Sequence, residues 1–443
     1  MHKYQPHTKS DIDHMLKVIG IDSIDDLFHK IPKALRFNKT YQIPSQYSDL
    51  ELTNFLQSLS KENQELKVFR GHGAFDVYTP SIVKQLTSRQ EFLTSYTPYQ
   101  PEVSQGTLQY IFEYQSMICE ITGMDITNAS MYDGPTATAE AMFMALAETG
   151  KKKVLISSTV RDRQIDVIKT YGHFRDVEFL LVPEKDGITD LSYLEDNLKD
   201  SAAVILQNPN KYGIIEDLNS VSSLVHQQQA LFILNTDPRS LAILKTPKAL
   251  QVDIVTGDLQ SLGIPLSFGG AYAGFLATTK ALIRKMPGRI CGLTNDVDGK
   301  RAFVLTLQAR EQHIRRAKAN SNICSNQSLM ALSVAIYLSA LGKEGFKDVA
   351  NLSLDGAYYL KDQLLKLNHF KPFTNHPHFN EFTLKFNGDY DKFNDYLLKY
   401  GYLGPVLQHD NLLTFAVTEK RTKQEIDHFI ELVGKFQWYT MIN

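Results

Sequence analysis

The fold class is decided by four short apolar runs in the middle of the chain: Val154-Leu-Ile-Ser-Ser158, Val177-Glu-Phe-Leu-Leu-Val182, Ala202-Ala-Val-Ile-Leu206 and Ala230-Leu-Phe-Ile-Leu234. The segments between them, such as 162–170 and 191–199, are amphipathic and of roughly helical length. Strands that are apolar on both faces and alternate with helices are typical of a buried, mostly parallel sheet. The sequence therefore predicts an α/β domain, to which 249–261 and 271–278 are expected to add further strands.

The regions on either side of this α/β pattern differ from it. Towards the N-terminus, apolar residues recur near helical spacing from Ile19 to Phe28 before Pro32 interrupts the pattern. We interpret this region as a helical arm or layer, the alternative being a small binding module. Towards the C-terminus, 326–342 is apolar enough to be a buried connector helix.

Beyond that helix, the pattern predicts a small α+β domain. Residues 379–386 and 412–417 have strand patterns, and 393–400 has a helical one. Thr422-Lys-Gln-Glu425 has the spacing of a capping box that begins a final helix. We expect three parts: an N-terminal helical arm (1–70), a large α/β domain (71–325), and a connector helix with a small C-terminal α+β domain (326–443).

Composition and charge limit the class of protein. The chain has 443 residues, 43% of them hydrophobic, and a net charge of −2, which excludes a disordered chain and disfavours a generally basic nucleic-acid binder. Its 3 cysteines, far apart in sequence, indicate a reducing compartment. No signal peptide is visible, and the apolar stretch 330–341 is shorter than the ~20 residues that span a bilayer. We expect a cytoplasmic protein that binds neither nucleic acid nor membrane.

Two segments resemble parts of a pyridoxal phosphate (PLP) site. The turn at Asp133-Gly134-Pro135 leads into an Ala-rich helix, whose first amides, with Thr136 and Thr138, could hold a phosphate as in a large class of PLP enzymes. The alternative is that this turn only caps a buried helix. Further on, 253–270 is a strand followed by a Gly/Pro-rich loop, where such enzymes place the lysine that binds PLP. No lysine occurs between Asp253 and Thr279.

Two further segments are candidates for binding. Residues 284–318 hold nine Lys or Arg and three acidic residues, which indicates either an anionic partner or internal pairing with carboxylates. A nucleic-acid groove is disfavoured, because Phe303 is the only aromatic residue there. The loop 96–106 combines prolines with phenols, amides and a carboxylate, which suits either the rim of a site or a packed surface loop. His72 and His313 are isolated, and no spacing of ligand residues indicates a metal.

Taken together, these segments resemble the P-protein of the glycine cleavage system, and within that family the first subunit of its split, two-subunit form. The resemblance covers nearly the whole chain. It is carried by Ile19-Gly-Ile-Asp-Ser-Ile-Asp-Asp-Leu-Phe28, Tyr96-Thr-Pro-Tyr-Gln-Pro-Glu-Val-Ser-Gln-Gly106-Thr-Leu-Gln109, Asn128-Ala-Ser-Met-Tyr-Asp-Gly134, Gln260-Ser-Leu-Gly-Ile-Pro-Leu-Ser-Phe-Gly-Gly270, Thr306-Leu-Gln-Ala-Arg-Glu-Gln-His-Ile-Arg-Arg316 and Ser321-Asn-Ile-Cys324.

The resemblance implies a PLP-dependent transferase of fold type I and explains the missing lysine. In the split form, subunit 2 resembles the PLP-binding half, and here Gln260 and Ser261 stand near the lysine position. The implied activity is that of glycine dehydrogenase (aminomethyl-transferring). Glycine loses its carboxyl as CO2, and its aminomethyl group passes to the oxidised lipoyl group of the H-protein. The implied partners are subunit 2, the lipoylated H-protein and glycine.

Because fold type I enzymes build sites between paired subunits, we expect this chain to line a pocket whose cofactor the partner holds. The candidates on the rim and substrate side are Tyr96, Tyr99, Gln100, Glu102 and Gln105. The candidates for contact with a carboxylate or the lipoyl carrier are Arg310, His313 and Arg315. The turn with Asp133, Gly134, Thr136 and Thr138 is expected to be a vestigial phosphate cradle.

The sequence departs from the family pattern at two places. Pro135 replaces a small residue and offers no amide donor, which weakens a phosphate site, and Cys291-Gly-Leu293 replaces a more usual Val-Gly-Glu. Two alternatives stay open at this point. One is a self-sufficient PLP enzyme that uses Lys300 or Lys318, and the other is a non-catalytic scaffold or binding protein that retains the fold.

Overall fold

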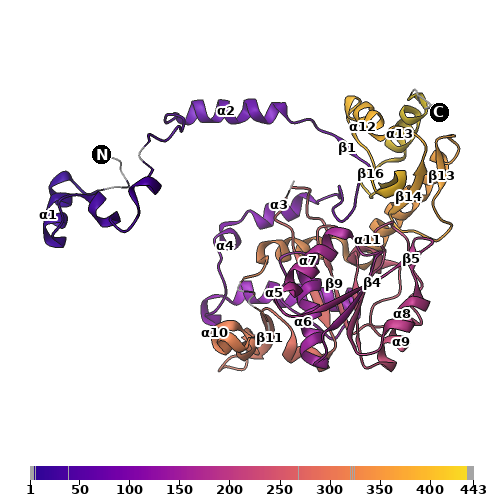
Figure 1. Ribbon diagram of the computed structural model, residues 1–443, viewed down its shortest axis with the longest axis horizontal. Coiled ribbons are helices and arrows are strands. Elements are labelled where there is room, and N and C mark those ends of the chain that lie inside the picture. The colour runs from indigo at the N-terminus through magenta and orange to yellow at the C-terminus, as the bar shows by residue number, and fades with distance from the viewer. Residues whose placement is uncertain are drawn as a thin grey trace. The chain divides into compact units, whose positions relative to one another are not determined.

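The structure is a computed structural model that describes residues 4, 6–37, 39–267, 269–319, 321, 323 and 325–436 (Figure 1). It contains two compact units, residues 1–64 and 65–443. The first unit holds the helices α1 (Lys9–Ile19) and α2 (Asp49–Glu62) and the 3-10 turns η1 (Ile24–Phe28) and η2 (Lys33–Leu35). Capping boxes at Thr8 and Ser48 begin the two α-helices. None of the described residues of this unit is buried within it.

The second unit is built on a seven-stranded sheet with the order β2-β10-β9-β8-β7-β3-β4. The five strands from β9 to β4 run parallel. At one edge, β10 pairs antiparallel with β9, and β2 pairs antiparallel with β10. The bounds are β2 (Ile126–Thr127), β3 (Lys153–Ser157), β4 (Glu178–Val182), β7 (Ser201–Gln207), β8 (Leu231–Asn235), β9 (Ile254–Asp258) and β10 (Gly274–Thr278). The mostly parallel α/β sheet predicted from the four apolar runs is confirmed.

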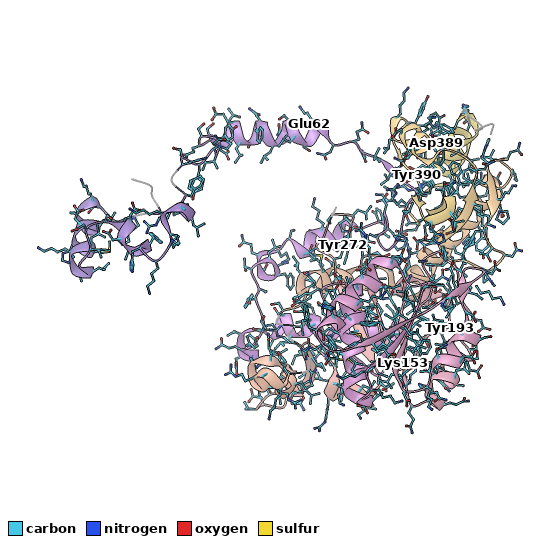
Figure 2. The ribbon with its side chains drawn as sticks, in the orientation of Figure 1. Glu62, Lys153, Tyr193, Tyr272, Asp389 and Tyr390 are labelled. Atoms are coloured by element: carbon cyan, nitrogen blue, oxygen red, sulfur yellow. The ribbon has the colours of Figure 1, made fainter. Side chains whose placement is uncertain are left out.

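Both faces of this sheet are covered. Alternate residues of β7 point to opposite sides, so Ala203 and Ile205 belong to one core while Val204 and Leu206 belong to the other. The first core is closed by α6 (Gly134–Thr149) and α7 (Asp162–His173). The second is closed by α5 (Gln105–Thr122), α8 (Leu191–Asn197), α9 (Val221–Gln227) and α11 (Ser328–Leu364). Lys153 on β3 and Tyr193 on α8 are labelled in Figure 2.

The C-terminal part is a four-stranded antiparallel sheet, β13-β14-β17-β16, covered by two helices around a Phe-rich core. Thr422 and Glu425 form the predicted capping box. The elements are β13 (Phe370–Pro372), β14 (Glu381–Phe386), α12 (Tyr390–Lys399), β15 (Tyr402–Leu403), β16 (Val406–Leu407), η8 (His409–Asn411), β17 (Leu412–Ala416) and α13 (Lys423–Lys435). Strand β1 (Lys67–Val68) pairs in parallel with β15.

The remaining elements are short and lie mostly in the connections. They are α3 (Ser81–Thr87), α4 (Gln90–Leu93), η3 (Pro101–Val103), β5 (Glu184–Lys185), β6 (Ile188–Thr189), η4 (Pro238–Ala242), η5 (Lys280–Lys285), β11 (Ile290–Asn295), β12 (Arg301–Thr306), η6 (Gln308–Arg310), α10 (Gln312–Arg315) and η7 (Arg316–Lys318). The β11–β12 hairpin and the α10 segment after it carry much of the basic stretch identified in the sequence.

Helix α11 extends further than the connector predicted at 326–342. Gly342 has φ 62° and breaks the helical path. Among the described residues, α11 is the one helix that is long and apolar enough to cross a membrane. A core helix passes the same test, and Val334 and Tyr337 of α11 are buried in the core beneath the sheet. Its length and composition therefore carry no argument for a membrane.

Gly213 provides a test of the packing between the large and C-terminal parts. Its φ is +82°, and an added Cβ would overlap the carbonyl of Glu381 on β14. Gly401 has φ +80° with nothing within 4 Å, so it is a matched control. We expect Gly401→Ala to lower the free energy of unfolding by about 1–2 kcal/mol from backbone strain. We expect Gly213→Ala to lower it by a further ~1–3 kcal/mol from overpacking. Equal losses in chemical denaturation would contradict this packing.

Candidate functional site

The predicted rim loop lies between α4 and α5, and its side chains have different surroundings. Tyr96 is 80% exposed and Tyr99 48%, and Gln100 and Glu102 are also exposed. Gln105 instead anchors the loop. Its Nε2 donates to the carbonyls of Pro101 (2.8 Å) and Phe303 (2.9 Å), and its Oε1 accepts from the Phe303 amide (2.9 Å). Gln105 therefore fixes the loop to β12 and is not free for a ligand in this arrangement.

Tyr99 and His313 are brought together by two residues that the sequence did not single out. The Arg289 Nη2 donates to the Tyr99 hydroxyl at 2.8 Å, and the guanidinium lies 5.2 Å from the centre of the Tyr99 ring. Glu311 Oε2 lies 3.9 Å from Arg289 Nε and 3.7 Å from His313 Nδ1. The Tyr99 and His313 rings meet edge to face at 6.1 Å. We call Tyr99, Arg289, Glu311 and His313 the rim cluster.

In the rim cluster the two charged side chains, Arg289 and Glu311, are buried, whereas the Tyr99 and His313 rings are exposed. The side chains of Arg289 and Glu311 are only 6% and 8% exposed, whereas that of His313 is 44% exposed. Arg289 Nε and Glu311 Oε1 are buried and have no hydrogen-bond partner among the residues that the structure describes. Because Arg289 donates to the Tyr99 oxygen, the phenolic O–H stays available as a donor to a ligand. The only sequence signals for these two residues were their charges within the basic stretch.

The other two basic candidates differ from each other. Arg310 is turned into the protein, where its guanidinium donates to the carbonyls of Leu307 (3.1 Å), Gly288 (2.9 Å) and Met286. Burial lowers its pKa from the ordinary value. Arg315 is exposed on α10. Sequence position alone could not distinguish a cation bound to backbone carbonyls from one that faces solvent.

One part of the basic stretch is paired with carboxylates within the chain, and another part is exposed to solvent. Lys285 pairs with Glu148 at 3.1 Å and Lys300 with Asp298 at 3.6 Å, which is internal pairing. Arg315, Arg316 and Lys318 are exposed and make no ion pair with any residue that the structure describes. A cationic surface remains next to the rim cluster.

A cavity lies at the strand ends, where the sequence led us to expect a site. The cavity, of about 190 Å³, opens where β8 and β9 end and α6 begins. It is lined by His72, Gly73, Phe75, Gly134, Pro135, Arg161, Arg163, Gln164, Asn235, Thr236, Asp237, Asp258 and Ser261. No lysine is among these lining residues. Lys300 lies in the β11–β12 turn and Lys318 in η7, so neither of the alternative lysines lines the cleft.

The first amides of α6 are all engaged within the chain. Gly134 donates to Asp258 Oδ2 at 3.2 Å, Thr136 to Asp133 Oδ1 at 2.8 Å, and Ala137 to the Asp133 carbonyl at 3.0 Å. Pro135 has no amide hydrogen. Phosphate groups at helix N-termini are held by free amides, and this turn offers none. The Thr136 hydroxyl is likewise bonded to the Asp133 backbone.

Thr138 is also hydrogen-bonded within the chain, and so are Gln260 and Ser261 near the expected lysine position. The Thr138 hydroxyl bonds to Thr256 Oγ1 (2.7 Å) and to the Gly134 carbonyl (3.0 Å). Gln260 is fully buried and bonded to backbone, and Ser261 donates to Asp237 at 2.6 Å. The residues present therefore do not fit a covalently bound PLP. The turn that the sequence analysis interpreted as a vestigial cradle begins α6 and has no free amide.

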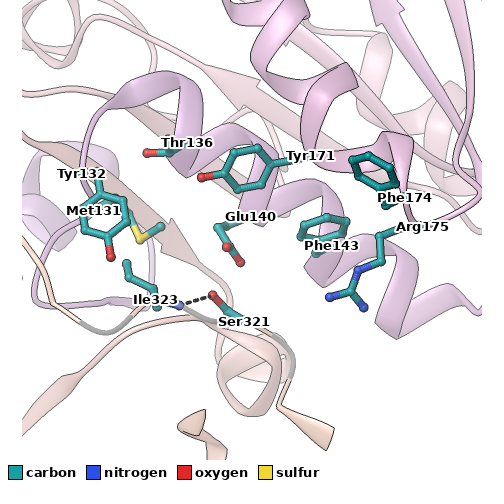
Figure 3. Close-up of a pocket in the computed structure, with 10 residues that line it drawn as sticks. All are labelled: Met131, Tyr132, Thr136, Glu140, Phe143, Tyr171, Phe174, Arg175, Ser321 and Ile323. Atoms are coloured by element: carbon teal, nitrogen blue, oxygen red, sulfur yellow. Dashed lines mark hydrogen bonds between the residues drawn. The ribbon is translucent and has the colours of Figure 1, made fainter. Parts of the chain in front are cut away.

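A second cavity, of about 320 Å³, lies between α6 and the end of α7 (Figure 3). Glu140 points from α6 toward Ser321, and aromatic rings of Phe143 and Tyr171 line the wall. Burial raises the pKa of Glu140 to about 7, against a hydrogen bond from Ser321 and the charge of Arg175. No sequence pattern indicated this pocket, because Glu140 stands inside an Ala-rich helix.

The remaining features of the site are its potential metal ligands and its cysteines. Within the described ranges, no group of three or more His, Cys, Asp or Glu could hold a metal ion. Cys119 and Cys291 are free thiols whose pKa burial raises to about 11. Asn322 and Cys324, which belong to the Ser321–Cys324 string, lie outside the described residues.

Comparisons with known proteins agree on one family. The family described as glycine cleavage system P-protein matches residues 2–433. A probable glycine dehydrogenase (decarboxylating) subunit 1 from Geobacillus sp. (strain WCH70) is 47% identical over 446 residues, which cover 98% of this chain and 99% of the relative.

Solved structures agree with the sequence relatives. A crystal structure of glycine decarboxylase (P-protein) of the glycine cleavage system, in inhibitor-bound form, matches with a TM-score of 0.88 and 43% identity over 98% of this chain and 99% of that one. A sphingosine-1-phosphate lyase from Burkholderia pseudomallei K96243 has a TM-score of 0.68 at 14% identity, covering 91% and 94% of the two chains. That likeness shows the fold alone, which is fold type I of the PLP-dependent enzymes.

Ionisation of Asp258, which lines this cleft, makes the free energy of unfolding depend on pH. Burial raises its pKa to about 7 and Asp133 adds to this, whereas the amides of Gln260 and Gly134 and the charge of Arg161 act against it. His72, Arg163 and Asp237 are the other ionisable groups lining the cleft. Because the folded pKa exceeds the unfolded one, the folded state binds the proton more tightly. Stability is therefore lost as pH rises from about 4 to about 7.

Asp258→Asn should remove this pH dependence, because an amide does not ionise. The variant also carries a cost that does not depend on pH, since Asp258 accepts from Gln260 at Oδ1 and from Gly134 at Oδ2, whereas an amide offers one oxygen. We expect the unfolding free energy of the variant relative to that of the wild type to be ~3 kcal/mol greater at pH 8 than at pH 5. Urea unfolding at both pH values measures this difference. A difference that stays constant between pH 5 and pH 8 would show that Asp258 is ionised at its ordinary pKa.

Proposed function

The chain belongs to the glycine cleavage system P-protein family, and we propose that it is the half of a split glycine decarboxylase that shapes the site without carrying the cofactor. The term subunit 1 in the relative's name implies a second subunit. The observation that carries the proposal is the contrast between two regions of this chain. Its own cleft has no lysine among its described lining residues and no free cradle amide, whereas its rim cluster presents the exposed Tyr99 and His313 beside an exposed cationic surface.

The proposed reaction takes glycine and the oxidised lipoyl group of an H-protein. The bond between the glycine α-carbon and its carboxyl breaks, and CO2 leaves. The aminomethyl remainder joins one lipoyl sulfur while the other becomes a thiol, so the disulfide is reduced by the electron pair that the broken bond leaves behind. PLP held by the second subunit supplies the electron sink for the cleavage.

The proposed part of this chain is to orient and to exclude water. Arg289 holds Tyr99 by both a hydrogen bond and a cation–π contact, so the phenol is fixed with its O–H directed away from Arg289. Glu311 lies between Arg289 and His313 and orients the imidazole. Groups fixed in this way lower a barrier because they need no reorganisation when charge develops. We place glycine's polar groups within reach of Tyr99 and His313.

The exposed cations suit the second substrate. Arg315, with Arg316 and Lys318 on η7, forms a cationic surface next to the rim cluster. Positive surface charge steers an acidic carrier and raises the rate of encounter. We propose this surface as the contact for the lipoyl carrier, with Tyr96 of the exposed rim loop as its apolar part. The reaction is expected in the cytoplasm.

Tyr99→Phe tests the rim cluster directly. In the complex with the second subunit, we expect kcat/KM for CO2 release from carboxyl-labelled glycine to fall about 10- to 100-fold. Assembly and Tm should be unchanged. Tyr400→Phe, at a tyrosine 52% exposed on the C-terminal part, is the matched control. A rate equal to that of the control would remove Tyr99 from the proposed site.

Arg289→Met tests whether Arg289 acts through Tyr99. If it does, the double variant with Tyr99→Phe should lose no more than the worse single variant, because the two groups act as one unit. Arg289→Lys should restore part of the rate, since an ammonium can still donate to the phenolic oxygen. Arg284→Met, at an exposed arginine of the same basic stretch, is the control. Fully additive losses would show that Arg289 and Tyr99 act independently.

A further inference from the structure

Gln260 stands near the position at which the resemblance places the cofactor lysine, and its side-chain amide is almost fully hydrogen-bonded. Nε2 donates to the carbonyls of Phe75 and Ile264, both at 2.7 Å, and Oε1 accepts from the Phe75 amide at 2.7 Å. The residue has no solvent exposure. A lysine ammonium is a donor only, so it could not accept from the Phe75 amide. Gln260 therefore joins the strand end to a segment 185 residues earlier in the chain.

Asp258 lies at the start of α6, where an enzyme of this fold would hold the cofactor's phosphate. Its carboxyl accepts from the Gly134 amide at 3.2 Å and from the Gln260 amide at 2.9 Å. An added Cβ at Gly134 would lie 2.9 Å from the Asp258 nitrogen, so the turn is packed directly on this residue. Asp133 accepts from the Thr136 amide. The carboxyls of Asp133 and Asp258 therefore bond the helix-start amides that an external anion would otherwise bind.

The same cleft joins the large part of the unit to its C-terminal part. Asp237 accepts from Ser261 and pairs with Arg239 at 3.3 Å, and the fully buried Arg239 reaches Glu419 beyond β17 at 3.5 Å. The Arg239 guanidinium also lies 5.0 Å from the centre of the Phe75 ring, in the segment that Gln260 holds.

A second ion pair crosses on the other side of the cleft. Arg161 of the large part pairs with Glu381 of β14 at 2.9 Å. Glu381 also accepts from the His72 amide. Its side chain is only 4% exposed. Two largely buried ion pairs thus connect the walls between which an enzyme of this fold would bind its cofactor.

We propose that this cleft is an internal clamp, in which Asp258 and Gln260 occupy the positions of the cofactor's anion and lysine while Arg239 and Arg161 join the two parts of the unit. The clamp is formed by hydrogen bonds and ion pairs within this chain, so its formation does not depend on which subunit carries PLP. Restoring the lysine alone would therefore not restore a cofactor site. The subunit would act as a rigid wall, with the loop and α10 segment of the rim cluster outside the clamp.

Borohydride trapping on Gln260→Lys tests this inference. The variant full-length chain is incubated with PLP or with pyridoxal, which lacks the phosphate, then reduced and analysed by mass spectrometry. Without free cradle amides, we expect labelling at position 260 to differ less than twofold between the two aldehydes. Labelling at least tenfold greater with PLP would show a working phosphate cradle and overturn the clamp.

Hydrogen exchange on the wild type provides a measurement that does not depend on folding of the variant. We expect the amides of Phe75, Gly134 and Thr136 to be protected as strongly as those of β7, and PLP to change none of them. Glu419→Gln should speed exchange at Phe75 and lower Tm by several degrees, whereas the exposed control Glu195→Gln should do neither. Fast exchange at these amides in the wild type, or slowing by PLP, would overturn the proposal.

Discussion

A parallel sheet that is buried on both faces can carry polar chemistry only where its strands end, and this constraint organises the molecule. Alternate residues of β7 fill two separate cores, so its interior has no space for a ligand. The carboxyl ends of β8 and β9 instead meet the start of α6 at one edge of the sheet. Whatever binds, or replaces, a cofactor in this fold has to be built there.

In this chain the edge is built from internal bonds. Asp258, Asp133 and Gln260 satisfy the groups that a cofactor would otherwise engage. Buried carboxyls and guanidinia are costly to desolvate unless they are paired, and Arg239 is paired with both Asp237 and Glu419. Exposed polar groups lie elsewhere, at the rim cluster, where Tyr99 and His313 reach the surface. A cleft whose helix-start amides are bonded within the chain, together with exposed polar groups at a rim, fits a subunit that completes its partner's site.

The sequence predicted the sheet well because burial on both faces leaves a local signature, and β3, β4, β7 and β8 lie within about one residue of the four apolar runs. It predicted a strand over 249–261 where only Ile254–Asp258 is one, because the flanking apolar residues pack in turns. It also could not give the antiparallel direction of β10. The bonds of Gln260 to Phe75, and of Arg289 to Tyr99, join residues 185 and 190 positions apart, and no local pattern records such contacts. Residue type alone placed Arg310 beside a ligand, whereas backbone carbonyls bind it.

The central claim is that the cofactor belongs to the second subunit while this chain supplies the wall of the site. Borohydride reduction of the wild-type complex with PLP, followed by mass spectrometry of both chains, tests it most directly. The account predicts one stoichiometric pyridoxyl adduct on a lysine of the second subunit and none on this chain. A full adduct on a single lysine of this chain, Lys300 and Lys318 included, would contradict it and make this chain the carrier of the cofactor.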